Sequence, residues 1–132
     1  MPDAPSPNVL HVMYAAAVLG AGLVGAITLF APATAERTVF AGSTSVTPYL
    51  RILGALWLAL GVVAALGFVD PLKFAPVLLI QFVYKTAWLI VVAYPALAGG
   101  NREPGLVFMA ALFTAWAAAL AFTAPWAYLL GR

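Results

Sequence analysis

The chain has 132 residues, of which 65% are hydrophobic and 8% are charged. Charged residues make up about a quarter of an average soluble domain, so this composition excludes that class and indicates an integral membrane protein. Six basic and four acidic residues give a net charge of +2 and are scattered singly, which argues against nucleic acid as a partner. The chain has no cysteine, which excludes disulfides, thiolate metal sites and thiol redox chemistry.

Four apolar segments are each long enough to cross about 30 Å of hydrocarbon as a helix. The expected helices span residues 9–30, 48–69, 71–94 and 104–123. Thr47 before Pro48 is a helix-start signal, because the cap oxygen accepts an amide hydrogen without a partner in the helix and proline carries no such hydrogen. Asp70 before Pro71 repeats this signal. Pro76 predicts a bend or a start a few residues later.

These segments predict an all-α integral membrane four-helix bundle with antiparallel up-down spans. It forms one transmembrane domain over residues 1–132, with loop 31–47 partly ordered and both termini on one side of the membrane. The N-terminus has no Lys or Arg before the first apolar segment, so we expect this segment to stay in the mature protein. Basic residues are divided almost evenly between the two sides, which leaves the orientation open.

Small residues recur one turn apart in the first span, as Ala21 and Gly25 and as Gly22 and Ala26. Such spacing lets two helix backbones approach closely in a membrane. The second span carries Gly54 and Gly61, and the fourth carries Ala111, Ala115, Ala118 and Ala119. We expect these residues to pack the bundle internally. The alternative is dimerisation through the first or fourth helix.

Lys85 lies near the middle of the expected third span. A cation there costs roughly 2.5 to 3.5 kcal/mol on insertion scales. Helical side chains lean toward the N-terminus of their helix, so Lys85 points away from the nearer interface and cannot simply reach it. The amine therefore needs a polar partner or a wet cavity.

Gln81 and Trp88 share a helix face with Lys85, and Tyr84 lies beside that face. We expect a pocket with Gln81 and Lys85 at its floor, opening toward the loops that follow the first and third spans. If the first loop folds back, Glu36 approaches either Lys85 or Arg51. The candidate ligand-binding residues are Lys85, Gln81, Trp88, Arg51, Trp57, Glu36 and Tyr84.

Three roles are open for Lys85. It either fixes the register of the bundle, whether charged or neutral, or binds a ligand or ion, or forms a Schiff base. Nothing else in the chain supplies an acid and a base for covalent chemistry, and no motif of known chemistry is present. The sequence therefore assigns no catalytic residue, no metal site and no identified cofactor, and it favours a protein that is not an enzyme.

Several short motifs resemble the small four-helix membrane proteins of bacteria called DoxX-like. They are Phe40-Ala41-Gly42 after a span that ends before Pro32, the run Tyr49 to Ala55 with Ala59 and Gly61, the set Gln81, Tyr84, Lys85 and Trp88, and the later Pro95 and Pro125-Trp126. The resemblance implies a membrane subunit of quinone-linked sulfur oxidation for the founding members and no assigned activity for most relatives. The resemblance assigns no catalytic residue to this chain. The chain also has no cysteine, so it lacks the thiol chemistry that a redox role in sulfur oxidation would suggest.

We expect a binding or accessory protein of the bacterial cytoplasmic membrane that holds a hydrophobic or amphiphilic ligand, such as a lipid or a quinone-like molecule, around Lys85. One alternative is a structural subunit of a larger membrane complex or a homo-oligomer. A weaker alternative is an enzyme acting on a lipid-phase substrate.

Overall fold

The computed structural model describes residues 5–42 and 44–132, and these ranges are helical with no strand. Four helices in them are long and apolar enough to cross a membrane, which suggests an integral membrane protein. They span Pro7–Phe30, Pro48–Leu66, Pro76–Ala98 and Pro104–Thr123. All-helical architecture is therefore confirmed, and the bounds of the fourth helix coincide with those expected from the sequence.

The first long helix comprises α1 (Pro7–Ala17), a π-helical segment η1 (Val18–Leu23) and α2 (Val24–Phe30). It begins two residues earlier than expected, because the Ser6 hydroxyl accepts the Val9 amide at 3.3 Å and caps its first turn. The π-helical segment has no signal in the sequence. It is a local widening of the helix, of the kind often found near functional sites.

The segment expected as a partly ordered loop contains a short helix, α3 (Pro32–Thr38). After it, Thr47 caps α4 (Pro48–Leu66) as predicted, accepting the Leu50 amide at 3.1 Å. The expected helix to residue 69 is too long, because residues 67–69 form a turn. Gly67 marks this end: the ring of Tyr14 occupies the space in which a Cβ would lie.

The third long helix comprises α5 (Pro76–Trp88), a second π-helical segment η2 (Leu89–Ala93) and α6 (Tyr94–Ala98). The helix starts later than the expected residue 71, at Pro76, as one of the two alternatives for that proline predicted, and it continues past the expected residue 94 to Ala98. Asp70 accepts the Lys73 amide at 3.2 Å and so caps a turn, while the helix begins at Pro76. Pro95 does not end the helix, because the preceding π-helical turn changes the hydrogen-bond register where proline lacks an amide.

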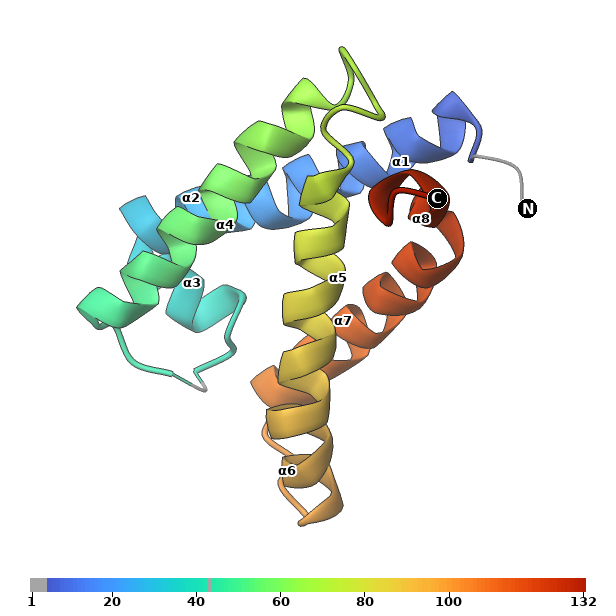
Figure 1. Cartoon of the computed structure of the whole chain (residues 1–132). Coiled ribbons are helices and arrows are strands. Elements are labelled where there is room, and N and C mark those ends of the chain that lie inside the picture. The colour runs from blue at the N-terminus through green and yellow to red at the C-terminus, as the bar shows by residue number, and fades with distance from the viewer. Residues whose placement is uncertain (1–4, 43) are drawn as a thin grey trace.

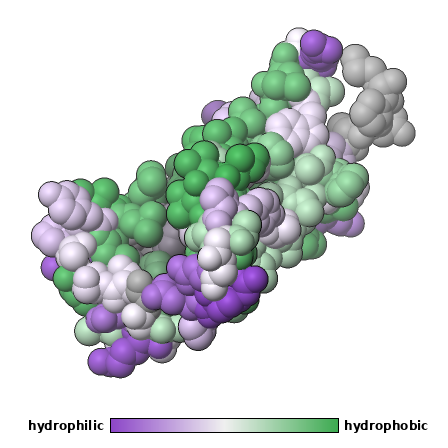
Figure 2. Space-filling view, turned by 90° about the horizontal axis from the view of Figure 1, so that it is seen from below, coloured by the Kyte–Doolittle hydropathy of each residue, from purple (hydrophilic) through white to green (hydrophobic). Residues whose placement is uncertain are grey.

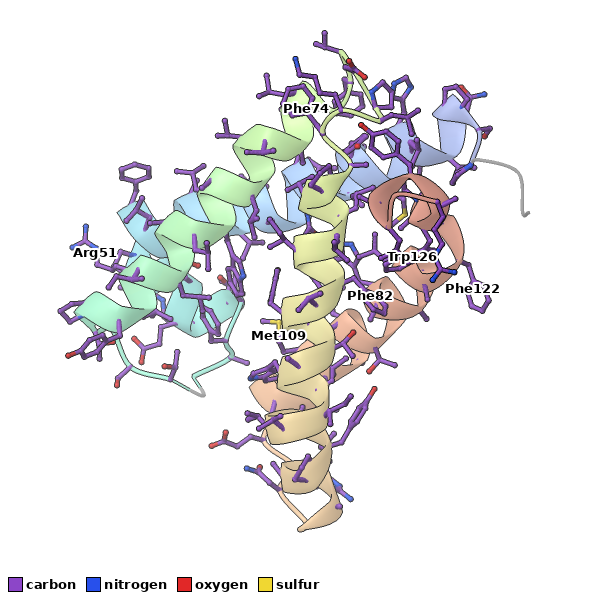
Figure 3. The ribbon with its side chains drawn as sticks, viewed as in Figure 1. Arg51, Phe74, Phe82, Met109, Phe122 and Trp126 are labelled. Atoms are coloured by element: carbon purple, nitrogen blue, oxygen red, sulfur yellow. The ribbon has the colours of Figure 1, made fainter. Side chains whose placement is uncertain are left out.

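The last helices are α7 (Pro104–Thr123) and the short α8 (Trp126–Leu129). Figure 1 shows α8 and the C-terminus on the same side of the molecule as α1. Trp126 fastens this end to the third helix, since its ring packs edge-on against Phe82 at 5.1 Å between centroids (Figure 3).

The long helices pack as two pairs, with α1, η1 and α2 along α4, and α5 and η2 along α7 (Figure 1). The first pair is joined by glycines. A Cβ at Gly25 would lie 2.7 Å from the carbonyl oxygen of Gly54, and a Cβ at Gly61 would lie 2.6 Å from the amide nitrogen of Gly22. The small residues of the first two helices therefore pack against each other, as expected for packing within the bundle.

Large apolar side chains cover much of the outside of all four long helices. Examples are Leu19, Ile52, Val91 and Phe122, of which Phe122 is 90% exposed. In Figure 2, hydrophobic residues form a broad area across the middle and upper right of the visible face, and hydrophilic residues gather in its lower part and toward its ends. This distribution is the reverse of that on a water-soluble bundle, whose outward helix faces are polar.

Candidate functional site

Lys85 is buried in the middle of the fold, with 1% of its side chain exposed. Its Nζ donates to Tyr84 Oη at 2.6 Å and to Gln81 Oε1 at 3.3 Å. Gln81 is fully buried and lies one helical turn before Lys85 on α5. The amine therefore has two polar partners, both supplied by its own helix.

Three aromatic rings surround the same amine, and we call Tyr84, Phe113 and Trp116 the aromatic cage. The distances from Lys85 Nζ to the ring centroids are 4.3 Å for Tyr84, 5.0 Å for Phe113 and 4.2 Å for Trp116. The faces of aromatic rings carry negative potential, so they attract an ammonium group within about 6 Å. Phe113 and Trp116 come from one face of α7, and the cage thereby connects α5 to α7.

A cavity of about 330 Å³ adjoins Lys85, and we call it the lysine cavity. Its lining residues are Gly20, Ala21, Val24, Thr38, Val39, Trp57, Tyr84, Lys85, Phe108, Met109, Leu112, Phe113 and Trp116. The lining comes from both helix pairs and from the end of α3, and within residues 5–42 and 44–132 it contains no carboxylate. Phe108 and Leu112 are 55% and 41% exposed, so one side of the cavity reaches the apolar surface of α7.

A second cavity of about 360 Å³, the outer cavity, lies beside the first. Trp57, Tyr84, Met109 and Phe113 line both cavities and separate them. Figure 3 shows Met109 between α4 and α5 in that view. The outer cavity also touches Phe40, Leu53, Trp88, Val92, Ala96, Asn101, Glu103, Gly105 and Leu106. Its polar residues, Asn101 and Glu103, are exposed and lie just before α7.

Several buried N–H groups around the lysine cavity find no acceptor in residues 5–42 and 44–132. They are Nε1 of Trp57 and Nε1 of Trp116, which line the cavity, and Nε2 of Gln81, which is bonded through its Oε1 to Lys85 but lines neither cavity itself. Lys85, as an ammonium, has three N–H groups and donates two of them within the fold. Buried donors usually have partners, so these unpaired N–H groups are an exception among the described residues.

The structure brings together five of the seven candidate residues. Lys85, Gln81 and Tyr84 form one hydrogen-bonded group, and Trp57 lines both cavities. Trp88 lines the outer cavity, where its ring packs edge-on against Phe113 at 5.4 Å. Gln81 and Lys85 are hydrogen-bonded, but of the two only Lys85 lines the lysine cavity, whose exposed large apolar lining residues Phe108 and Leu112 lie on α7 and not on the loops after the first and third spans.

Arg51 and Glu36 lie apart from Lys85, which corrects the expectation that loop 31–47 would bring a carboxylate to this site. Arg51 points away from α5 and α7 (Figure 3), and its Nε donates to the Leu29 carbonyl at 3.1 Å. That carbonyl lies at the end of α2, where the helix leaves it without an internal partner. Glu36 is held in α3 and lines neither cavity.

The contribution of α7 was missed by sequence reasoning. Met109, Phe113 and Trp116 recur at helical spacing, which is the signal that one face of α7 shares an environment. Gly20 was missed as well. A Cβ on Gly20 would overlap the ring of Trp116, so the absence of a side chain in η1 creates the position that this ring occupies beside Lys85.

Comparison of the chain with protein-family models, with curated proteins and with solved structures finds no match in any of the three. The function proposed below therefore depends on the geometry of the site.

Proposed function

We propose that this chain is an integral membrane protein that binds a hydrophobic or amphiphilic molecule, such as a lipid or a quinone-like compound, in the lysine cavity. In this proposal the four long helices are antiparallel up-down spans. Because the sequence resembles the DoxX-like proteins of bacteria, we also propose that its membrane is the bacterial cytoplasmic membrane.

Helix length and surface chemistry support insertion into a bilayer. The four long helices have 24, 19, 23 and 20 residues, close to the approximately 20 that cross a hydrocarbon core. Their outward apolar side chains would be unfavourable in water at this density. The position of α8 on the same side of the molecule as α1 fits an even number of crossings (Figure 1).

The observation that carries the binding proposal is the set of unpaired N–H donors beside the lysine cavity. Trp57 contributes a donor from α4, Trp116 contributes one from α7, and Lys85 retains a third N–H on α5. Three separate helices thus bring donors to one apolar cavity of a size typical for small-molecule sites. An occupant with acceptor oxygens would satisfy groups that the fold leaves unsatisfied.

Binding fits the geometry better than catalysis does. Among the residues that the structure describes, the lysine cavity is lined by one amine, one phenol and one threonine hydroxyl with otherwise apolar or indole groups, and by no carboxylate or imidazole. General acid and base catalysis requires a proton acceptor within hydrogen-bond reach of the reacting group. Lys85 is instead engaged by Gln81 and Tyr84, which hold it in place.

Mass spectrometry of molecules that co-purify with the protein tests this proposal. The protein is purified in mild detergent and its organic extract is analysed for the wild type, Lys85→Met and Lys73→Met. We expect a specific molecule near one per chain in the wild type and in Lys73→Met, where the replaced lysine is exposed. In Lys85→Met, the amount of this molecule per chain should fall at least about tenfold while the helix content is retained, because the lost contact is charge-assisted. An extract equal to bulk lipid in all three samples contradicts the proposal.

A structural subunit of a larger membrane complex is the second candidate. Ala111, Ala115 and Ala118 lie on α7 and are exposed, unlike the small residues that join α1–α2 to α4. Small side chains on a lipid-facing helix allow a second helix to approach closely. A protein that co-purifies with the wild type and is lost in Ala115→Leu would support this candidate, and a clean monomer would contradict it.

A further inference from the structure

The charge around Lys85 narrows the chemical class of the ligand, on the premise that the lysine cavity binds one. Of the carboxylates in the described residues, Glu36, Asp70 and Glu103 are all absent from the lining of that cavity. Glu103 lines only the outer cavity. The partners of Lys85 are a neutral amide, a neutral phenol and three aromatic rings. Burying an ammonium group without an anionic partner is unfavourable. A bound anion would offset this cost and stabilise the charged form of Lys85.

The hydrogen-bonding inventory of the cavity is equally one-sided. Its buried N–H donors belong to Lys85, Trp57 and Trp116, whereas its side-chain oxygens are the hydroxyls of Tyr84 and Thr38. The Tyr84 oxygen already accepts from Lys85. A carboxylate is an acceptor-only group with about four lone-pair sites, so it could accept from the amine and from indole N–H groups together.

The rest of the lining favours one apolar chain attached to that head group. The apolar wall of the cavity includes Val24, Met109 and Phe113. The side that reaches the surface of α7 is bordered by the half-exposed Phe108 and Leu112. In a membrane this side would face acyl chains. A volume of about 330 Å³ is near the lower end for ligand sites, which favours a single-chain molecule over a two-chain phospholipid.

We infer that the ligand of the lysine cavity is a long-chain carboxylic acid bound as its carboxylate. Its head group meets Lys85 and the indole N–H groups of Trp57 and Trp116, and its chain leaves the cavity past Phe108 and Leu112 toward the bilayer.

Fluorescence quenching measures this preference directly, because Trp57 and Trp116 line the cavity. The probes are a dibrominated stearate, its methyl ester, a dibrominated single-chain lysophosphatidate and a short-chain ubiquinone analogue, each titrated into delipidated protein in mild detergent at mildly alkaline pH. The ester keeps the chain and both bromines but lacks the charge. We expect the acid to bind at least about tenfold more tightly than the ester, as one charge-assisted hydrogen bond warrants.

Three variants locate the preference. In Lys85→Met, the affinity for the acid should fall to the affinity for the ester. Trp116→Phe keeps most of the ring and removes one N–H donor, so it should weaken acid binding severalfold even if Lys85→Met fails to fold. Trp126→Phe is the matched control, because that indole N–H already donates to the Ala121 carbonyl at 2.9 Å and lies outside the cavity lining.

The possible outcomes separate the ligand class from the proposed function. Equal binding of the acid and the ester, or tighter binding of the quinone, overturns the carboxylate inference and leaves a ligand-binding cavity. Tighter binding of a single-chain lysophosphatidate than of stearate assigns the site to a phosphate instead. Absence of saturable quenching by every probe contradicts both the inference and the proposed function.

Discussion

The two helix pairs are built by opposite means. In the pair formed by α1–α2 and α4, glycines at positions 22, 25, 54 and 61 bring the two backbones into direct contact. In the pair formed by α5 and α7, large side chains hold the helices, and Tyr84, Trp88 and Phe113 pack edge-on. Backbone contact leaves no room for a ligand, whereas packed rings leave irregular space between them. Both main cavities accordingly border the second pair.

The two pairs therefore differ in their contribution: the first mainly holds the structure together, and the second forms most of the candidate site. The first pair contributes Gly20, Ala21, Val24 and Trp57 to the lysine cavity, while the second pair supplies Lys85 and the whole aromatic cage. Substitutions of the glycines that join the first pair should therefore act on stability. Substitutions in the second pair should act on ligand binding as well, with smaller losses of stability.

The largest effect is expected from Gly25→Ala in the first pair. The new Cβ would lie 2.7 Å from the Gly54 carbonyl oxygen and 2.8 Å from the Trp57 carbonyl carbon, and backbone atoms cannot move aside as side chains do. We expect a loss of about 3 kcal/mol or more in the free energy of unfolding, at the upper end for overpacking. Unfolding by sodium dodecyl sulfate in mixed micelles, followed by circular dichroism, measures it.

Gly99→Ala is the control for that experiment. At Gly99 the nearest atom to a new Cβ is the Pro95 carbonyl oxygen at 3.4 Å, which is an ordinary contact. We expect a change within about 0.5 kcal/mol, as for most surface substitutions. Equal stabilities of the two variants would show that α1–α2 and α4 do not depend on close backbone contact.

An intermediate effect is expected from Phe113→Ala in the second pair. Phe113 is 7% exposed, and its ring contacts Tyr84, Trp88 and the Lys85 amine. Replacement of a buried phenylalanine by alanine typically costs about 3 to 5 kcal/mol. Because Phe113 already borders two cavities, we expect a smaller loss of about 2 to 3 kcal/mol in the same unfolding measurement.

Phe122→Ala is the matched control on the same helix. Its ring is 90% exposed and points away from the other helices (Figure 3), so little packing is lost. The comparison would fail if both phenylalanine variants lost the same stability, since α7 would then contribute no specific packing at the aromatic cage.

The parts of this fold that could be predicted are those encoded locally. Runs of apolar residues predict the four long helices, because a span must satisfy its backbone internally over a fixed length. The cap at Thr47 was predictable from its side chain and the following proline. The pairing of Lys85 with Gln81 was also predictable, because residues four apart lie on one face of a helix. The hydrogen bond from Lys85 to Tyr84 was not, because adjacent residues do not share a helix face.

The parts that could not be predicted depend on contacts between distant segments. Pro95 predicts a helix end, but the π-helical turn before it lets the helix continue. Arg51 suggested a ligand contact, yet the Leu29 carbonyl, far away in sequence, takes its hydrogen bond. Trp116 enters the site only because Gly20 of another helix leaves space for its ring. The spacing of residues within one segment carries no information about such contacts between distant segments.

The smallest effect is expected where the second pair carries a polar contact between its helices. Tyr94 Oη and Thr114 Oγ1 are 2.7 Å apart and join α6 to α7 on an exposed face. Hydrogen bonds between membrane helices average about 0.6 kcal/mol in double-mutant cycles, because the separated helices also find partners. A cycle of Tyr94→Phe and Thr114→Val should therefore give a coupling energy near this value. A coupling of zero would mean that side-chain packing alone joins α6 to α7, and one of about 2 kcal/mol would mean that this hydrogen bond rivals the aromatic contacts in holding the pair together.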